Sequence, residues 1–400
     1  MELDTHQLAA IDAGASSRFA IITGGAGTGK TTIIKTIAER LVAEGCEVAL
    51  CAFAGKAAAR LREACKRPAS TIHRLLGSNG TRFMRETLEG VSVVMDEASM
   101  VSSDLMAEII RRNPDRLILV GDPAQLPPVG RGQPFHDLIK LRPTSVSHLV
   151  TCYRATEAVY QAAHAIRGGA SPEISAVSSG ERWDMMNTGD AGATQRTLMQ
   201  WVEAGALDFE QDVILCPKNG SETEPCTVAG LNAAIVSMIG ARREKATDIK
   251  PGDRVINTAN IPQKDVWNGT TGTVHSIDID GGVFVRVDVP AIDWDRTQTE
   301  TDPVYTDTVM FSAKEAKGLQ HAYALTVHKS QGSQYRRVVF IALNRDSHVL
   351  LDRSLIYTAI TRTREQCVVV GNVQALVGGI GKVSNKRTVL QELAAKEEVA

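Results

Sequence analysis

The chain has 400 residues, enough for two or three domains and a sizeable hydrophobic core. Its net charge of −2 neither favours nor excludes nucleic acid as a partner. No run of about 18 apolar residues occurs and the acid-containing N-terminus is unlike a signal peptide, so we expect neither a membrane span nor a leader. The seven cysteines form no C-x-x-C pair, which predicts a reduced, cytoplasmic protein without structural zinc.

Short apolar strands alternate with helical patterns through the first 150 residues. The strands are predicted at 19–23, 47–53, 91–97 and 116–122, each as a buried parallel strand. After a glycine-rich loop, one helical face is predicted to carry Ile33, Ile34, Ile37, Leu41 and Val42, and Gly45 ends that helix. This pattern predicts a doubly wound α/β domain over residues 1–150.

A second α/β unit is predicted over residues 151–400. It begins with a helical, loop-rich stretch at about 151–208. The later elements are strands at 212–217, 324–328, 337–343 and 366–372 and a helix at 354–364. Residues 252–290 are rich in Val, Thr, Gly and Asn-Gly, which is typical of hairpins. We therefore expect a small β-barrel, over about 252–320, inserted in the second unit.

The sequence Gly24-x-x-x-x-Gly29-Lys30-Thr31 is a complete Walker A motif between a predicted strand and a predicted helix. Its glycines let backbone N–H groups approach phosphates, and the helix N-terminus adds partial positive charge. Lys30 is expected to reach the β- and γ-phosphates, and the Thr31 hydroxyl to bind Mg²⁺. The expected cofactors are ATP and Mg²⁺, and the expected nucleotide contacts from this loop are Gly25, Ala26, Gly27, Thr28, Gly29, Lys30, Thr31 and Thr32.

Adjacent acids, Asp96 and Glu97, end the third predicted strand. Asp96 is expected to hold Mg²⁺, and Glu97 to orient and deprotonate the attacking water. Together with the Walker A motif, this pair favours hydrolysis over simple binding. In the loop at 119–130, Gln125 is a candidate sensor of the γ-phosphate, although Gly-Asp-Pro and Pro-Pro can also simply form turns.

Several strings, in this order, resemble motifs of superfamily 1 helicases, in particular the RecD-like and Dda-like branch. They are "DTHQLAAI", "FAGKAAARL", "ASTIHRLLG", "VVMDEASMV", "VGDPAQLPPV", "HLVTCYR", "YALTVHKSQGSQY" and "LIYTAITRTRE". The resemblance implies an α/β fold of two tandem RecA-like doubly wound parallel-sheet domains. It also implies a small SH3-like β-barrel inserted in the second domain and a short β-hairpin, or pin, in the first.

The resemblance also assigns roles to residues outside the Walker motifs. Gln7 is expected to contact adenine, and Gly332 lies in a string that contacts the nucleotide. From the second domain, Arg154 is expected as a γ-phosphate ligand and Arg362 as an arginine finger, so that ATP bridges both domains. The catalytic set is then Lys30, Asp96, Glu97, Gln125, Arg154 and Arg362. Two departures are Phe53-Ala54, where the branch has Pro-Thr, and Gln334, where it has Glu.

Residues 56–85 contain eight Lys or Arg and one acid, so this block either lines a phosphate backbone or is a solvated helix face. Phe53 is a candidate for stacking on bases or for the core, whereas Trp267, beside Asn268-Gly269, is expected to be exposed and to stack. Residues 76–90 contain Asn79-Gly80, which predicts a small pin with Phe83 as its wedge. The candidate DNA contacts are Phe53, Lys56, Thr71, His73, Phe83, Pro127, Trp267, Asn268, His328, Lys329 and Ser330.

These features predict an ATP-dependent helicase that moves 5′ to 3′ on single-stranded DNA, with the polarity taken from the resemblance alone. Two alternatives stay open: an RNA-directed helicase or ATPase, and a non-unwinding translocase module of a larger repair, recombination or conjugation assembly. The expected partners are single-stranded DNA and its junctions with duplex. Single-stranded-DNA-binding protein or replication and repair proteins are further candidates. We expect no membrane association and a monomer.

Overall fold

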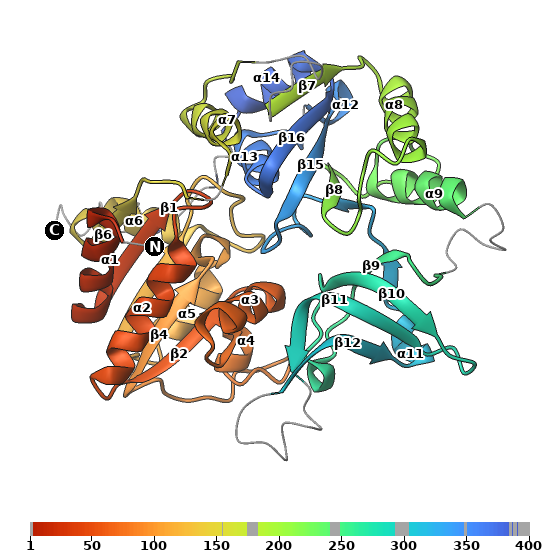
Figure 1. Cartoon of the computed structure of the whole chain (residues 1–400). Coiled ribbons are helices and arrows are strands. Elements are labelled where there is room, and N and C mark those ends of the chain that lie inside the picture. Colours follow the sequence, from red (N-terminus) through yellow and green to blue (C-terminus); the bar gives the residue numbers. More distant parts are fainter. Residues whose placement is uncertain are drawn as a thin grey trace. The chain divides into compact units, whose positions relative to one another are not determined.

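The computed structural model describes residues 3–153, 155–173, 183–240, 249–292, 304–347 and 350–383, together with Lys386 and Leu390. The chain divides into two compact units, Met1–Arg154 with Ser384–Ala400, and Ala155–Val383 (Figure 1). Among the described residues, no helix is long and apolar enough to cross a membrane.

The first unit is built on one six-stranded parallel sheet with the strand order β3-β2-β4-β5-β1-β6. Its strands are β1 (Phe19–Gly24), β2 (Glu47–Ala52), β3 (Ala69–Thr71), β4 (Val91–Asp96), β5 (Arg116–Gly121) and β6 (Val146–Leu149). Its helices are α1 (Thr5–Ser16), α2 (Lys30–Ala43), α3 (Gly55–Cys65), α4 (Ile72–Leu75), α5 (Ser103–Ile110) and α6 (Pro134–Leu141), with short 3₁₀ turns η1 (Ala98–Met100) and η2 (Pro143–Ser145).

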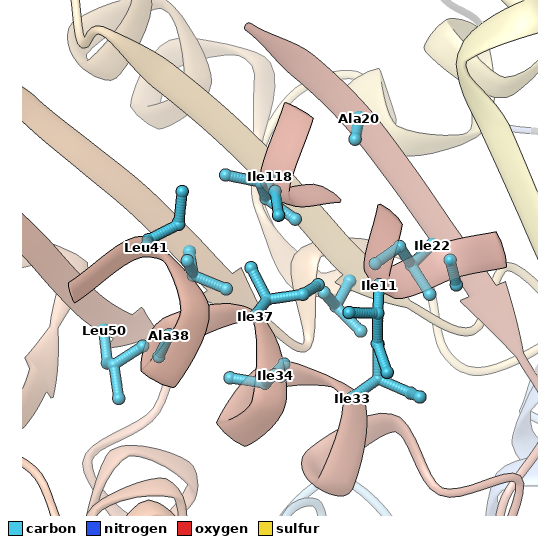
Figure 2. Packing of buried hydrophobic residues seen from close by; sticks show 14 of the residues in the cluster. Ile11, Ala20, Ile22, Ile33, Ile34, Ile37, Ala38, Leu41, Leu50 and Ile118 are labelled. Carbon is cyan, nitrogen blue, oxygen red and sulfur yellow. The ribbon is translucent and has the colours of Figure 1, made fainter. Parts of the chain in front are cut away.

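Alternating side chains of the first sheet enter two separate cores. Ile22 of β1 packs with α1, α2 and α3, and the buried cluster around it is drawn in Figure 2. Its neighbour Ile21 packs on the opposite face, with α5 and α6. A strand with apolar side chains on both faces needs helices on both sides, which is the doubly wound arrangement. Of the five residues predicted to share one face of α2, Ile33, Ile34, Ile37 and Leu41 are buried, whereas Val42 is exposed.

The second unit contains a parallel sheet with the order β14-β8-β15-β16-β7 and an antiparallel sheet with the order β12-β11-β10-β9-β13. The parallel strands are β7 (Trp183–Asn187), β8 (Asp212–Cys216), β14 (Ala324–Thr326), β15 (Tyr335–Ala342) and β16 (Thr363–Gly371). The antiparallel strands are β9 (Arg254–Asn257), β10 (Thr271–Ile277), β11 (Val283–Ile292), β12 (Tyr305–Phe311) and β13 (Leu319–His321). The helices are α7 (Glu157–Gly168), α8 (Ala191–Glu203), α9 (Val228–Ile239), α11 (Ala313–Ala316), α12 (Asn344–Ser347), α13 (Arg353–Ile360) and α14 (Val373–Gly381), with the 3₁₀ turn η4 (Pro262–Lys264).

The antiparallel sheet is an insertion between β8 and β14, which are neighbours in the parallel sheet. It has its own apolar core, to which Val255, Val285 and Phe311 contribute. An Asn268-Gly269 turn, with Gly269 at φ +94°, leads into β10. The predicted hairpins are therefore present, and the chain returns from them directly into the parallel sheet.

Candidate nucleotide and nucleic-acid site

Three candidate segments of the first unit meet at one edge of its sheet. The phosphate loop follows β1, the acidic pair ends β4, and the segment with Gln125 follows β5. Since β5 lies between β1 and β4 and all three strands are parallel, their carboxyl ends are adjacent. A Cβ on Gly121, the last residue of β5, would lie 3.1 Å from the backbone N of Ser99, so the turn after β4 closely approaches β5. Ligand sites of doubly wound sheets lie at this edge.

The phosphate loop needs its glycines for geometry. Gly27 and Gly29 have φ of +80° and +85°, which side-chain-bearing residues rarely adopt. A Cβ on Gly29 would also lie 2.6 Å from Nε2 of Gln7. Lys30, the first residue of α2, turns back and donates from Nζ to the carbonyls of Gly24 and Gly25, both at 2.8 Å. The loop therefore holds a cation over backbone N–H groups at a helix N-terminus, a donor set suited to phosphate.

Glu97 is prepared for a ligand in two ways. Its backbone is left-handed, with φ +52°, a strain that tends to persist at functional sites. Its Oε2 is buried and has no hydrogen-bond partner in the part of the chain that the structure describes, although buried polar atoms are normally paired. Asp96 is half-buried and accepts the Glu97 N–H at 2.8 Å. The pair thus places one unsatisfied carboxylate oxygen at the edge where the phosphate loop lies.

The N-terminal helix is tied to the phosphate loop through Gln7, which is buried and donates from Nε2 to the Thr28 carbonyl at 3.2 Å. Gln7 and Asp4 form a capping box: the Gln7 N–H donates to Asp4 at 2.8 Å and the Asp4 N–H to Gln7 at 3.1 Å. Gln7 therefore has a clear positioning role for the loop, whatever it contacts in the nucleotide.

Tyr153 is a candidate site residue that the sequence reasoning missed. Its hydroxyl donates to Asp4 at 2.7 Å, its N–H donates to the Gly27 carbonyl at 2.9 Å, and its side chain is 40% exposed. The Gln7 N–H, and after it the Tyr153 hydroxyl, hold the pKa of Asp4 below its usual range. Cys152 packs on the same loop, with Sγ 3.4 Å from the Ala26 carbonyl. The signal was available, because an aromatic residue directly precedes Arg154.

Cys152 and Tyr153 therefore lie on the phosphate loop and belong to the first unit. Arg154 itself lies outside the described residues, so its predicted contact with the γ-phosphate has no structural description.

The loop after β5 holds Gln125 in a buried position. Its backbone N–H donates to the Asp122 carbonyl, and its Nε2 lies 3.5 Å from Asp122 Oδ2. The Pro123 carbonyl in this loop can only accept, so His136 carries the proton on the Nε2 that lies 2.6 Å away. Burial lowers the pKa of His136, which keeps the imidazole neutral. Lys386 donates to the Pro128 and Gly130 carbonyls of the same loop.

Three of the predicted DNA contacts line one pocket in the first unit. The His73 ring lies 6.4 Å from that of Phe53 and 5.9 Å from that of Phe83. The pocket has a volume of about 610 Å³, and its apolar and aromatic wall includes Phe53, His73, Phe83, Met100, Leu105 and Val129. Phe53 is half-buried, so it contributes to the core and to the pocket together. Aromatic rings facing an open pocket suit stacking on bases.

The remaining candidates of the first unit are less accessible than expected. Lys56 is 6% exposed, and Arg62 of the same basic block is 4% exposed. The Thr71 hydroxyl accepts the Arg74 N–H as the N-cap of α4. Pro127 is half-buried in the loop after β5. The basic block is therefore not simply a solvated face, and two of its cations lie inside the unit.

The predicted hairpin is present, and Phe83, its predicted wedge, lies at the base of the hairpin and not at its tip. Ser78 and Phe83 form an antiparallel bridge around Asn79-Gly80, and Gly80 has φ +94°. Phe83 is half-buried at the base, where it packs against the core and His73, because an aromatic ring is stabilised by burial. The exposed tip is Asn79–Arg82.

In the second unit, Arg362 lies between α13 and β16 and is 4% exposed, with Nε donating to the Thr358 carbonyl at 3.2 Å. The predicted nucleotide and DNA contacts after β14 form one loop, in which Ser330 is fully buried, His328 is exposed and Gly332 has φ +72°. Ser330 donates to the Val327 carbonyl at 2.8 Å. Burial lowers the pKa of Lys329.

In the antiparallel sheet, Trp267 is half-buried rather than fully exposed, because its Nε1 reaches Asp265 at 3.3 Å. Asn268 is exposed, and its N–H donates to the Asn260 side chain at 2.9 Å. The two residues lie beside the turn at Gly269, as the sequence predicted.

The residues of the phosphate loop and the acidic pair fit a nucleoside triphosphate with Mg²⁺. A Cβ at Gly29 would collide with Nε2 of Gln7, and the buried Oε2 of Glu97 has no hydrogen-bond partner among the described residues. Thr31 and Asp96 offer a hydroxyl and a carboxylate, the hard oxygen ligands that Mg²⁺ prefers. Within the described part of the chain, no cluster of three or more His, Cys, Asp or Glu is arranged to hold a metal by itself.

Two protein-family models match parts of the chain. Residues 2–191 match the AAA domain family, and residues 321–370 match the UvrD-like helicase C-terminal domain. The chain resembles the Pif1 helicase from Bacteroides in complex with ADP-AlF3 and ssDNA, with TM-score 0.59 and 18% identity over 100% of this chain and 98% of that chain. For Pif1 from Candida albicans the TM-score is 0.55, with 18% identity over 100% and 99% of the two chains. At this identity the likeness establishes the fold: two parallel sheets and an antiparallel sheet.

Sequence relatives define the family. The ATP-dependent RecD2 DNA helicase of Deinococcus radiodurans is 32% identical over 93% of this chain, which spans 50% of that protein's length. The RecBCD enzyme subunit RecD of Mycobacterium tuberculosis is 30% identical over 94% of this chain and 71% of its own length. Taken with the converging loops at the edge of the first sheet, these matches show that the chain belongs to the RecD family of superfamily 1 helicases.

Proposed function

We propose that the chain is an ATP-dependent helicase that moves 5′ to 3′ on single-stranded DNA and separates duplex strands. The observation that carries the proposal is the convergence of three loops at one sheet edge, with the cation of Lys30 and the unpaired buried oxygen of Glu97 among them. This arrangement suits phosphoryl transfer to water, because it combines a phosphate cradle with a candidate general base. The direction of movement rests on the family.

Each residue of the site has a proposed role in ATP hydrolysis. Lys30 binds the β- and γ-phosphates, Glu97 orients and deprotonates water, and Gln125 responds to the γ-phosphate from the loop beside it. Mg²⁺, held by Thr31 and Asp96, would neutralise phosphate charge as it transfers. Arg154 and Arg362 are proposed γ-phosphate ligands, with Arg362 as the arginine finger. Tyr153, fixed by Asp4 beside the loop, is proposed to contact the nucleotide base.

The finer architecture is part of the same proposal. The two parallel sheets are proposed as RecA-like motor domains, with the antiparallel sheet as an SH3-like barrel and the hairpin at Asn79-Gly80 as the pin. The pocket lined by Phe53, His73 and Phe83 would hold a base of the translocated strand. The loop at 328–330, in the second unit, would contact the sugar-phosphate backbone of that strand. Contacts of this kind position a strand without reading its sequence, as a motor requires.

The test compares strand separation on two DNA duplexes that are identical except for their tails. One carries a 5′ single-stranded tail and the other a 3′ tail, with Lys30→Ala protein as background. We expect ATP-dependent unwinding from the 5′ tail only. Unwinding from the 3′ tail alone would overturn the direction. ATP hydrolysis without unwinding of either duplex would overturn the DNA helicase and favour a translocase module or an RNA-directed enzyme, which matched RNA duplexes would distinguish.

A further inference from the structure

A short hairpin in the first unit is too small to be stable by itself. Its two arms, which run from Leu76 to Arg85, are joined by backbone bonds from Arg85 to Leu76 at 3.0 Å and from Met84 to Gly77 at 3.1 Å. At the tip, Asn79 Oδ1 accepts the N–H groups of Thr81 and Arg82 at 3.0 and 2.8 Å. A two-stranded hairpin of this size is marginal in water. Its position therefore depends on what holds its base.

Arg112, which follows α5, makes the main side-chain hydrogen bonds to the base of the hairpin. Its side chain is only 11% exposed. Its Nε donates to the Arg85 carbonyl at 2.5 Å, and its Nη2 lies 3.5 Å from the Phe83 carbonyl. Its Nη1 donates to the Glu108 carbonyl at 2.6 Å and the Glu108 carboxylate at 2.7 Å. The guanidinium carbon lies 5.7 Å from the centre of the Phe83 ring. One planar group thus joins the last turn of α5 to the returning arm.

The other end of α5 lies close to the acidic turn of the proposed nucleotide site. The turn η1 directly follows Glu97, and Ser102, shortly after η1, caps the N-terminus of α5. The N–H of Ser103, the first residue of α5, donates to the Arg131 carbonyl at 2.8 Å, in the segment that continues from the Gln125 loop. A single helix therefore runs from the acidic turn to the hairpin.

We propose that Arg112 is a positioning residue for strand separation: it fixes the hairpin and the Phe83 ring on α5, so that the hairpin meets the fork as a rigid wedge. This inference rests on the proposed helicase function. Lysine cannot replace the arginine, because an ammonium group lacks the planar fork that serves three carbonyls, a carboxylate and a ring together. The buried side chains of Leu105, Met106 and Ile109 also hold α5, so we expect the unit to remain folded when Arg112 is changed.

The test uses the full chain with Arg112→Lys. We expect the number of base pairs separated per ATP to fall at least about tenfold on a 5′-tailed duplex, because a small misplacement of a working group has a large effect on rate. Hydrolysis of ATP stimulated by single-stranded DNA, and movement along that strand, should stay within about twofold. Amide hydrogen exchange should rise in residues 76–85 and stay unchanged in β1, β4 and β5.

The control is Arg142→Lys, which changes an exposed arginine at the end of α6 in the same way. A second variant, Glu108→Gln, weakens the ion pair with Arg112 without removing the guanidinium. It should reduce the number of base pairs separated per ATP by less than Arg112→Lys does. Deletion of Gly80-Thr81 as a single change should reduce the number of base pairs separated per ATP. Combined with Arg112→Lys, the deletion should reduce that number no further, because both changes act through the hairpin.

The outcomes separate the inference from the function on which it rests. A wild-type protein that unwinds neither duplex overturns the helicase proposal and this inference with it. A wild-type protein that unwinds, beside an Arg112→Lys protein that separates as many base pairs per ATP, overturns the inference alone. Additive losses from Arg112→Lys and the tip deletion also overturn it.

Discussion

Lys30 and Glu97 are prepared differently for the same ligand. Lys30 is satisfied within its own loop, since its ammonium group donates to the Gly24 and Gly25 carbonyls. Glu97 has a strained backbone and a buried oxygen to which none of the described residues donates a hydrogen bond. Leaving a buried polar atom unpaired costs about 1–3 kcal/mol, which is retained where a function compensates for it. The strain and the orphan oxygen could not be predicted from the sequence, which showed only two adjacent acids.

For Lys30→Ala we expect ATP turnover to fall by roughly 10²-fold or more, because the charge that would bind the transferring phosphate is removed. The fold should survive, since the hydrogen bonds that Lys30 Nζ makes with the described residues stay within the loop. Steady-state ATPase with single-stranded DNA measures the loss, and thermal unfolding checks the fold. Normal hydrolysis by this variant would show that the phosphate site is wrongly assigned.

For Glu97→Gln we expect nucleotide binding to persist while hydrolysis falls by about 10²–10⁴-fold, because an amide cannot take a proton from water. Binding of a fluorescent ATP analogue and single-turnover hydrolysis separate the two effects. Glu63→Gln, at an exposed acid of α3, is the matched control. Unchanged hydrolysis in Glu97→Gln would mean that another group activates the water.

At the scale of elements, the sequence predicts what long apolar runs determine. β1, β4, β5 and β8 lie within a residue or two of their predicted bounds, because strands buried on both faces are continuous apolar runs. β3 has only three residues, and β7 carries an aspartate and an asparagine, so neither shows such a run. The helix predicted at 354–364 corresponds to α13, which ends at Ile360 because the polar start of β16 pairs with β15.

Side-chain contacts between separate helices, strands and loops could not be predicted from the sequence. The hydrogen bond of Tyr153 with Asp4 joins residues 149 positions apart in the sequence, and that of Arg112 with Arg85 joins residues 27 positions apart. Local patterns carry no signal for such pairs, because they depend on which strands become neighbours in the sheet. The motifs therefore predicted which loops form the site but not what holds those loops in position.

The cap of α1 gives an element-scale prediction. For Asp4→Ala we expect the KM for ATP to rise roughly threefold to tenfold with little change in kcat, because α1 and Tyr153 lose their shared anchor beside the phosphate loop. Since the pKa of Asp4 is lowered in the folded protein, its contribution is present at neutral pH and is lost as the pH falls into the acidic range. Steady-state kinetics of Asp4→Ala and Tyr153→Phe measure the effect, and an unchanged KM in both would contradict it.

At the scale of the whole molecule, each unit carries part of the proposed machinery. The first holds the phosphate loop, the acidic pair and the hairpin, and the second holds Arg362 and the loop at 328–330. In the proposed mechanism, hydrolysis would be converted into movement because groups from both units would contact the same nucleotide. The proposal therefore requires a residue of the second unit that acts only in turnover.

For Arg362→Ala we expect ATP binding to persist while turnover falls by about 10³-fold or more, as for other arginine fingers. The side chain is 4% exposed and donates to the Thr358 carbonyl, so thermal unfolding must first show that the second unit remains folded. Arg364→Ala, two residues along and exposed, is the matched control and should hydrolyse ATP normally. If Arg362→Ala is stable and turns over ATP at the normal rate, hydrolysis is completed within the first unit alone. Unwinding would then require a different link between the units, because the nucleotide would no longer be what joins them.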